Sequence, residues 1–291
     1  MAIVCGTDLS KRSRAAVTAA AAIAGAMREP LWVVHVVDGS VPLLDESARE
    51  KLLAAARERL DAEPAPAFGG VAVRHAVVEG SPHGALLDLA HAERARLVVV
   101  SSQGHGASPL YRLGGTSERV ALDAELPVLV VRDAQPFEAW SRGERPLRVV
   151  VGVELGASAA AAIAWAKQLP TLGPCQLVFA HAYYEGEALA RHALHGAAGR
   201  SVPDLERLLE RDVAALVGDV SSPAALVIRV RPAIGRIADP LLAIAEEDRA
   251  DLVVVGTHHR RGLARLWSVS GAVLHHARMA VATIPAAAAS A

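Results

Sequence analysis

Aromatic side chains are scarce in this sequence, although apolar residues are abundant. Phe, Trp and Tyr together account for 3% of the 291 residues, whereas 52% of the residues are hydrophobic. Ala, Val and Leu must therefore build the core, which suits close packing of helices on a sheet better than a β-sandwich. The composition favours an α/β fold.

Cysteine occurs at only two positions. Cys5 and Cys175 each lie within an apolar run, and neither has a second Cys at C-x-x-C spacing or a neighbouring His. This pattern argues against metal binding and redox chemistry at the thiols. We expect two buried thiols in a reducing compartment.

The sequence also lacks an excess of either charge. Thirty Lys and Arg residues against 31 Asp and Glu residues give a formal net charge of −1, and no basic stretch is interleaved with aromatics, so nucleic acid is not expected as a partner. The Ala-rich run 15–26 is interrupted by Thr18 and Gly25 and is too short to span a bilayer. We therefore expect a soluble cytoplasmic protein without a membrane segment.

The chain contains an internal repeat, as its length of two typical domains suggests. Three pairs of segments match in order along the chain. They are 3–10 with 149–156, 32–36 with 178–182, and 97–104 with 252–259. The offset between the copies grows by nine residues before the last pair. We therefore place an insertion in the second copy, in the loose segment 183–202, which contains several Gly and His residues.

The sequence of each copy predicts alternating strands and helices. Continuous Val-rich runs predict buried strands, and an amphipathic helix is expected over 44–60, with Leu52, Leu53, Ala56 and Leu60 on its apolar face. Ser81 and Pro82 predict the cap and first turn of a helix that ends at Ala92. The strands are expected near 2–8, 31–38, 71–78, 96–101 and 127–131, then near 147–153, 175–182, 226–231, 251–256 and 280–284.

This alternation predicts two tandem α/β domains. Each is expected to be a doubly wound, open, parallel five-stranded sheet with right-handed crossovers and helices on both faces. The expected boundaries are 1–135 for the first domain, 136–146 for a linker that contains Pro136, Gly143 and Pro146, and 147–291 for the second domain.

Ligands of such sheets bind beyond the carboxyl ends of the strands, where the strand order reverses. In the first copy the loops there contain Asp8, the segment 101–106 and the segment 113–117, which opens a helix. Small residues in these loops leave backbone N–H groups accessible, and the helix N-terminus adds a partial positive charge. The pattern indicates an anion site in the first copy.

The ordered set of motifs resembles the universal stress protein family. ATP-binding members of that family carry Gly, two residues, Gly, nine residues, then Gly followed by Ser or Thr, on a Rossmann-like fold. The supporting motifs here are Asp8, the pair His35-Val36, the turn 78–82 and the ending 117–131. Each of the two copies shows this resemblance, so that together they cover nearly the whole chain.

The resemblance implies which residues hold an adenine nucleotide, ATP with or without Mg²⁺. Asp8 is expected at the adenosine end and the Val36 main chain at the adenine edge, with the main chain of Gly104, Gly114 and Gly115 at the phosphates. Two positions depart from the family pattern: Ser101 stands in place of the first glycine, and Gly115 replaces the Ser or Thr. Thr116 and the adjacent Ser117 are the hydroxyls that could substitute.

Purely structural roles are an alternative for some of these residues. Asp8 could serve only as a helix cap, and His35 could be only a packed strand residue.

In the second copy, Gly256 is kept, but counting the same spacing places His259 and Val269 at the other two glycines, with Ser270 as the final hydroxyl. A β-branched residue disfavours positive φ and would stand where phosphate approaches. Glu154 replaces the strand-end Asp. We expect the second site to hold no nucleotide.

No catalytic or metal-binding constellation is evident in the sequence. No Ser-His-Asp order, no Walker-type Gly-Lys-Ser/Thr and no paired carboxylates are found. The histidines at 258, 259, 275 and 276 lack a Cys or Asp that would complete a familiar ligand spacing, so no metal is expected.

Three functional hypotheses remain at this point. The leading one is a cytoplasmic stress-response protein, not an enzyme, that binds ATP or AMP in its first domain. Its two domains would pair as an intramolecular pseudo-dimer through edge strands 127–131 and 280–284, because an unpaired apolar edge is a liability, and a further homodimer is compatible with this. The second is a nucleotide-independent interaction module with two vestigial sites, in which 183–202 recruits a partner. The third is an enzyme that acts on adenylated substrates.

Overall fold

The chain forms two structural units. The computed structural model describes residues 1–39, 45–63, 70–104, 113–156, 159–194, 202–220, 226–257 and 268–286. Residues 1–145 make up the first unit and residues 146–291 the second. Each unit has its own sheet, and each is described by itself below.

The first unit is a parallel sheet in the order β3-β2-β1-β4-β5. The order reverses beside β1, the first strand of the chain, which therefore lies in the middle of the sheet. The elements are β1 (Ala2–Thr7), α1 (Lys11–Met27), β2 (Leu31–Asp38), α2 (Glu46–Asp61), β3 (Val73–Gly80), α3 (Pro82–Ala92), β4 (Ala95–Ser101), α4 (Gly115–Asp123), β5 (Val128–Val131) and α5 (Gln135–Ser141).

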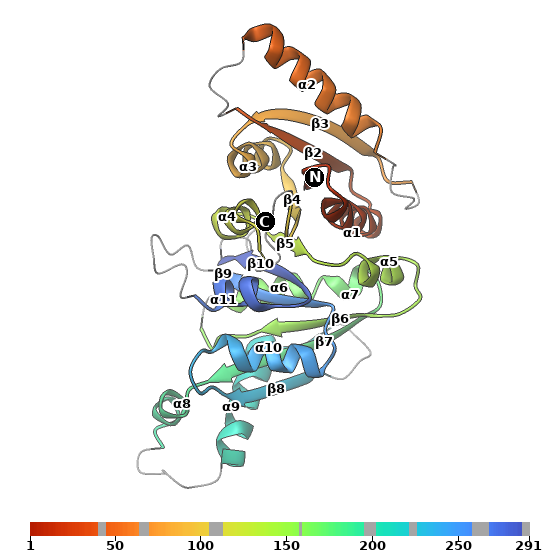
Figure 1. The fold of residues 1–291 in the computed structure, drawn as a ribbon. Coiled ribbons are helices and arrows are strands. Elements are labelled where there is room, and N and C mark those ends of the chain that lie inside the picture. Colours follow the sequence, from red (N-terminus) through yellow and green to blue (C-terminus); the bar gives the residue numbers. More distant parts are fainter. Residues whose placement is uncertain are drawn as a thin grey trace. The chain divides into compact units, whose positions relative to one another are not determined.

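Helices cover both faces of this sheet. Helix α1 packs on β1 and β4 and α2 on β2 and β3, while α3 packs on β2, β3 and β4 and also contacts α4. Figure 1 shows α3 and α4 on one side of the strands and α1 on the other. The small side chains of Ala16, Ala20 and Ala24 are fully buried, so α1 can approach the sheet closely.

The second unit repeats this architecture in the order β8-β7-β6-β9-β10, with all described pairs parallel. Helix α6 packs on β6, β9 and β10, and α9 packs on β7 and β8. Helix α10 packs on β6, β7 and β8 and also contacts α11, which packs on β9 and β10. The elements are β6 (Leu147–Gly152), α6 (Ala159–Ala166), α7 (Leu169–Leu172), β7 (Cys175–Tyr183), α8 (Glu185–Arg191), α9 (Val202–Val217), β8 (Val227–Pro232), α10 (Ala238–Glu247), β9 (Leu252–Thr257), α11 (Val269–His276) and β10 (Ala280–Pro285).

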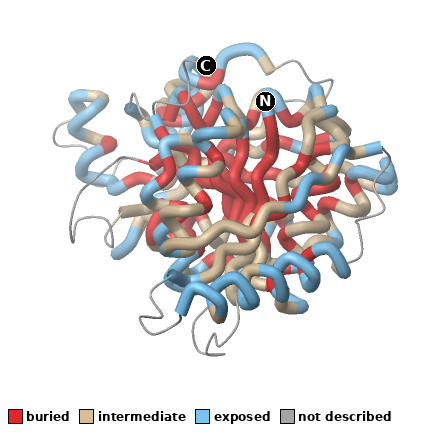
Figure 2. Tube along the Cα trace, turned by 90° about the horizontal axis from the view of Figure 1, so that it is seen from above, coloured by how far each residue is buried: buried red, intermediate tan, exposed pale blue. Residues whose placement is uncertain are grey.

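The predicted fold class is therefore confirmed, with two tandem, doubly wound, five-stranded parallel sheets. Buried residues concentrate on the central strands, and the outer surfaces of the helices are exposed (Figure 2). Cys5 and Cys175 are both buried, as expected, and burial raises the pKa of the Cys5 thiol. In the described part of the chain no helix is long and apolar enough to cross a membrane.

Two packing contacts recur at equivalent positions in the units. A Cβ at Gly6 would come within 2.9 Å of Leu86 Cδ2, and a Cβ at Gly152 would come within 2.9 Å of Leu241 Cδ2. Glycine is thus required at both places because a leucine from the covering helix fills the space that a side chain would need. The repeat seen in the sequence is a repeat of packing as well.

Two expectations about helix α2 and the start of α3 need correction. Only Ala56 and Leu60 are buried on α2, whereas Leu52 is 41% exposed. The buried face of α2 is therefore narrower than the sequence suggested, and Leu53 is only half-buried. Ser81 is the N-cap of α3, but its side chain makes no capping hydrogen bond.

The segment expected as a linker contains helix α5. Phe137 is 1% exposed and Trp140 is 3% exposed, and α5 packs against α1. The two aromatics, three positions apart, lie on one face of the helix. Their burial ties residues 135–141 to the first unit.

The burial of α5 leads to a stability prediction. Phe137→Ala should lower the free energy of unfolding of the first unit by roughly 3–5 kcal/mol, because it leaves a cavity where a large ring was buried. Gln135→Ala, at an exposed position of the same helix, should change it by less than about 0.5 kcal/mol. Urea denaturation of the whole chain measures both, and equal stability of the two variants would show that α5 is only a connector.

Candidate functional site

The candidate site lies where the strand order reverses, at the carboxyl ends of β1 and β4. Asp8 follows β1 directly, and Ser101 is the last residue of β4. Because β1 and β4 are neighbouring parallel strands, their ends lie side by side. This is the crevice in which open α/β sheets bind ligands.

The backbone after β1 makes a strained turn. Leu9 has a φ of 60°, a left-handed conformation that is unfavourable for a bulky residue. Its N–H donates to Thr7 Oγ1 at 3.1 Å, and the Ser10 N–H donates to Asp8 Oδ1 at 3.1 Å. Ser10, not Asp8, is the N-cap of α1. Strain of this kind is typical of positions that hold a side chain for a ligand.

Gly104 lies against the Asp8 carboxylate. A Cβ built at Gly104 would collide with Asp8 Oδ2, so any other residue would displace the carboxylate or the loop. The structure thus brings together two residues that the sequence placed in one site, although they are 96 positions apart in the chain.

Helix α4 begins beside this pair. Gly114 is its N-cap, and the Gly114 N–H donates to the Ser102 carbonyl at 2.7 Å. No side chain caps the helix, and a Cβ at Gly115 would meet nothing within 4 Å among the described residues. Among the described residues, therefore, no side chain caps the first turn of α4 and none crowds Gly115, an arrangement compatible with an anion site.

Two hydroxyls could replace the missing Ser or Thr, and one of them, that of Ser117, already donates a hydrogen bond within the protein. Ser117 is 8% exposed, and its Oγ donates to the Ser101 carbonyl at 2.6 Å. Thr116, in contrast, is exposed. Ser117 therefore joins α4 to the end of β4, and Thr116 is the hydroxyl that faces solvent. The buried hydrogen bond of Ser117 was missed in the sequence, where nothing separates the roles of two adjacent hydroxyls.

Val36 lies in β2, one residue beyond the last pair that β2 makes with β1, which is Thr7 with His35. The His35 ring is joined to the end of β1, since its Nδ1 lies 2.9 Å from the Thr7 carbonyl. No pattern of residue types in the sequence indicates this contact. His181 repeats it in the second unit, with its Nδ1 2.7 Å from the Val153 carbonyl.

The corresponding helix start in the second unit does not have the register expected by counting. Val98 pairs with Val128, thirty residues later, whereas the equivalent Val253 pairs with Val281, twenty-eight residues later. The second copy is thus two residues shorter between these strands. The residues 258–267, which include His258 and His259, lie outside the described residues.

This shift reassigns three positions. The C-caps of α4 and α11 bond back to Val120 and Val273, so Ser270 corresponds to Ser117 and is likewise buried. Val269 then corresponds to Thr116 and Ser268 to Gly115. The expectation that Val269 replaces the third glycine was wrong, because fixed spacing ignores the shorter loop.

Helix α11 also differs from α4 in its cap. Ser268 is the N-cap, and its Oγ accepts a hydrogen bond from the Gly271 N–H at 3.1 Å. One donor of the first turn is therefore already satisfied by the chain itself. At the start of α4 the equivalent residue is Gly115, which has no side chain to make this bond.

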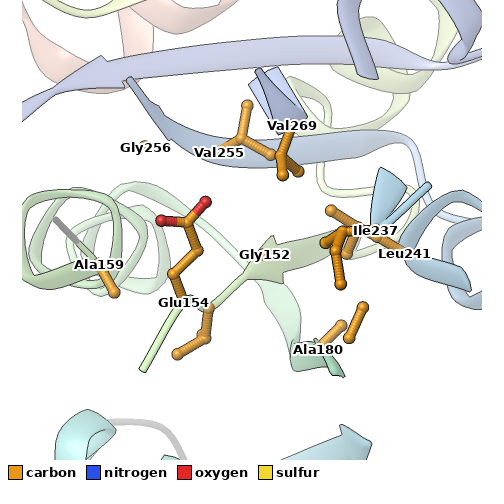
Figure 3. A pocket seen from close by; sticks show the side chains of 11 residues that line it. Gly152, Glu154, Ala159, Ala180, Ile237, Leu241, Val255, Gly256 and Val269 are labelled. Carbon is orange, nitrogen blue, oxygen red and sulfur yellow. The ribbon is translucent and has the colours of Figure 1, made fainter. Parts of the chain in front are cut away.

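A cavity lies at the equivalent strand ends of the second unit. Figure 3 shows Glu154, which follows β6, among aliphatic side chains from β9, α10 and α11. Among the described residues, Glu154 supplies the one charged side chain of that lining. The acidic residue at the end of the first strand is thus kept in both units, but its surroundings differ.

The described histidines of α11 do not form a metal site. His276 Nε2 lies 3.1 Å from Arg236 Nη1, a guanidinium that repels cations. Within the described ranges no group of three His, Cys, Asp or Glu residues is arranged to hold a metal ion.

These features define a chain of two tandem, doubly wound α/β domains, each with a candidate site at its strand reversal. The model of the universal stress protein family matches residues 1–132 and 147–285, and the chain belongs to this family. The resemblance drawn from the sequence motifs is confirmed.

Relatives of similar length exist. Universal stress protein Rv2005c of Mycobacterium tuberculosis is 29% identical over 298 aligned residues, which cover 96% of this chain and 95% of the relative. A universal stress protein of Thermus aquaticus is 35% identical over 130 residues, 44% of this chain and 93% of the relative. The fold is similar to the crystal structure of a universal stress protein from Archaeoglobus fulgidus, with a TM-score of 0.69 at 19% identity and coverage of 98% and 96%.

The two hydroxyls at the start of α4 give a matched pair of variants. Ser117→Ala should lower the free energy of unfolding by about 1–2 kcal/mol, because the buried Ser101 carbonyl loses its donor. Thr116→Ala should change it by less than about 0.5 kcal/mol, since the side chain is exposed. Chemical denaturation compares them, and a larger loss in the Thr116 variant would reverse the assignment.

Proposed function

We propose that the first domain binds an adenine nucleotide, ATP or AMP, at the carboxyl ends of β1 and β4, and that the protein acts in the stress response through this binding. The observation that carries the proposal is the uncapped start of α4 next to the Asp8–Gly104 contact. A free helix N-terminus and an acidic side chain in one crevice match the two ends of a nucleotide.

The phosphates would lie at the start of α4. The Gly114 N–H is already bonded to the Ser102 carbonyl, so Gly115 would present the backbone N–H group there, and the two glycines would let the ligand approach the main chain closely. The Thr116 hydroxyl is exposed beside them and would supply the contact that Ser or Thr makes in ATP-binding relatives. Ser101 and Gly104 shape the loop before it. Mg²⁺ would enter with ATP, held mainly by phosphate oxygens.

The adenosine would lie nearer β1 and β2. The Asp8 carboxylate is held in place by the Ser10 N–H and can accept hydrogen bonds from hydroxyl groups of a ribose. Val36 lies just beyond the last pairing of β2 with β1, so its main chain is the part of β2 best placed to meet an adenine edge.

The proposed role is one of binding and not of catalysis. The groups brought together at this site are backbone N–H donors, one hydroxyl and one carboxylate, which hold and orient an anion. A cytoplasmic location and the pairing of the domains through their edge strands stay predictions from the sequence.

Calorimetric titration of the whole chain with Mg-ATP tests this proposal. It should give about one site per chain, and ATP at a hundredfold excess over its Kd should stabilise the folded state by about 2.7 kcal/mol. Two nucleotide sites per chain would contradict the assignment to the first domain alone. Absence of binding for both ATP and AMP would favour the interaction-module hypothesis.

Gly115→Val is a second, independent test. It should abolish nucleotide binding while leaving the fold intact, because a Cβ there meets no atom of the described residues within 4 Å but would stand against the phosphates. Gly186→Val, on α8 of the second unit, is the matched control, since a Cβ there also meets nothing within 4 Å. If the Gly115 variant kept the affinity of the parent, the phosphates would not lie at α4.

A further inference from the structure

Two hydroxyl groups lie beside the strained turn of the first unit. Thr7 Oγ1 and Ser13 Oγ are 2.9 Å apart, and Ser13 is buried. The Leu9 N–H donates to Thr7 Oγ1 at 3.1 Å. Because the donor belongs to the residue whose φ is 60°, the Thr7 hydroxyl offsets part of the cost of the left-handed conformation.

Ser13 extends the same network to the start of α1. Its Oγ donates to the Ser10 carbonyl at 3.0 Å and accepts from the Ser10 N–H at 3.1 Å. A hydroxyl has a single proton to donate, so Ser13 Oγ accepts from Thr7 Oγ1 while it donates to Ser10. The Thr7 hydroxyl thus donates to Ser13 and accepts from Leu9, and one arrangement of protons satisfies all these bonds.

The Ser10 N–H connects this network to the Asp8 carboxylate. The Ser10 nitrogen lies 3.1 Å from Ser13 Oγ and 3.1 Å from Asp8 Oδ1. The other carboxylate oxygen, Asp8 Oδ2, is the atom with which a Cβ at Gly104 would collide. Ser13 therefore acts on the position of the carboxylate through a backbone N–H that both side chains share.

Val153 of the second unit corresponds to Thr7. The Thr7 carbonyl contacts His35, and the Val153 carbonyl contacts His181, each at the end of the first strand of its unit. Valine has nearly the shape of threonine but lacks the hydroxyl. Val153 therefore offers no side-chain acceptor to the N–H two residues later.

The two serines of the network are replaced in the second unit as well. The Ser13 N–H donates to Ser10 Oγ, and the Ala159 N–H donates to the Gly156 carbonyl at 3.3 Å, so Ala159 corresponds to Ser13 and Gly156 to Ser10. Ser13 and Ala159 are both buried. Figure 3 shows Ala159 and Glu154 in the lining of the same cavity. No hydroxyl of the network is kept at these positions.

The backbone conformation differs together with these side chains. Leu155 is the counterpart of Leu9, and it is not among the described residues with positive φ. The contact of His35 with Thr7 has its equivalent in the second unit, so it does not account for the difference. The left-handed turn therefore occurs in the unit that has the hydroxyls.

We propose that Thr7 and Ser13 are positioning residues for Asp8. Their hydroxyls hold the left-handed turn at Leu9, and this turn directs the carboxylate toward the ribose of the nucleotide. The proposal rests on the nucleotide function proposed for the first domain, but its structural part can be tested without a ligand. Neither hydroxyl belongs to the ligand contacts proposed above.

Thr7→Val and the conservative Thr7→Ser test the proposal on the whole chain. Valine occupies the equivalent position of the second unit, so the fold should be kept. Calorimetric titration compares ATP with its dideoxy analogue, which lacks both ribose hydroxyls. Thr7→Val should weaken ATP binding roughly tenfold, because a hydrogen bond to a charged group contributes this much. Binding of the analogue should stay within about twofold, since it offers Asp8 no ribose hydroxyl, and Thr7→Ser should restore the preference for ATP.

A loss of stability alone would not change this preference. Equal weakening of ATP and the analogue in Thr7→Val would therefore overturn the positioning role. Thr18→Val is the matched control, since Thr18 is a half-buried threonine of α1 outside the network. It should leave both affinities unchanged, and an equal loss of the ATP preference in this variant would also contradict the proposal.

Asp8→Asn separates positioning from direct contact with the ligand. In this background Thr7→Val should cause no further loss of ATP affinity, because the carboxylate that it positions is already gone. Ser13→Ala, which introduces the residue found at Ala159, should behave as Thr7→Val does in both backgrounds. Additive losses of affinity would show that Thr7 acts independently of Asp8 and would overturn the proposal.

Crystal structures without a ligand complete the test. Leu9 should keep its positive φ in the parent and in Thr7→Ser, and it should leave the left-handed region in Thr7→Val and Ser13→Ala. An unchanged Leu9 φ in either of these two variants would overturn the proposal, whatever the affinities. If the parent bound neither nucleotide while the turn and the Asp8 carboxylate moved as expected, only the nucleotide function would be refuted.

Discussion

The reversal of strand order beside the first strand of each unit is the constraint on which the rest of the structure depends. Because β1 and β6 are the central strands, the chain leaves them toward one face of the sheet and leaves β4 and β9 toward the other. Two loops therefore separate above neighbouring strand ends, and a crevice opens between them. Gly6 and Gly152 contribute to it, since their missing side chains let Leu86 and Leu241 pack onto the strand just before it ends. The position of the site therefore follows from the topology of the sheet, whichever residues line it.

The same crevice is given different chemistry in the two units. In the first, the Asp8 carboxylate lies against Gly104, and no side chain caps the start of α4. In the second, the Ser268 side chain caps the start of α11, and residues of α8 line the space beside Glu154. The duplicated fold thus carries different side chains at equivalent strand ends.

Much of the frame could be predicted from the sequence, because buried parallel strands appear as continuous Val-rich runs and the repeat supplied each strand twice. The expectations that differ from the structure have local causes. Pro136, Gly143 and Pro146 suggested a linker, and they concealed the signal of Phe137 and Trp140, the two aromatics whose burial holds α5 in place. The predicted alignment of Val269 was wrong because counting along a fixed spacing cannot reveal that a loop is two residues shorter. The partner of Ser117 is a carbonyl sixteen residues away, and no pattern of residue types reveals such a contact.

Comparison of the two units distinguishes contacts that maintain the fold from residues that differ between the two candidate sites. His35 and His181 each join the second strand of their unit to a carbonyl at the end of the first, although the side chains at the neighbouring strand ends differ. A contact that is present in both units while its surroundings differ maintains the sheet, so these histidines have a structural role. Leu9 differs from them, since its counterpart Leu155 is not among the described residues with positive φ. The left-handed turn is therefore particular to the first unit, and in the proposed nucleotide site its cost would be offset by the placement of the Asp8 carboxylate.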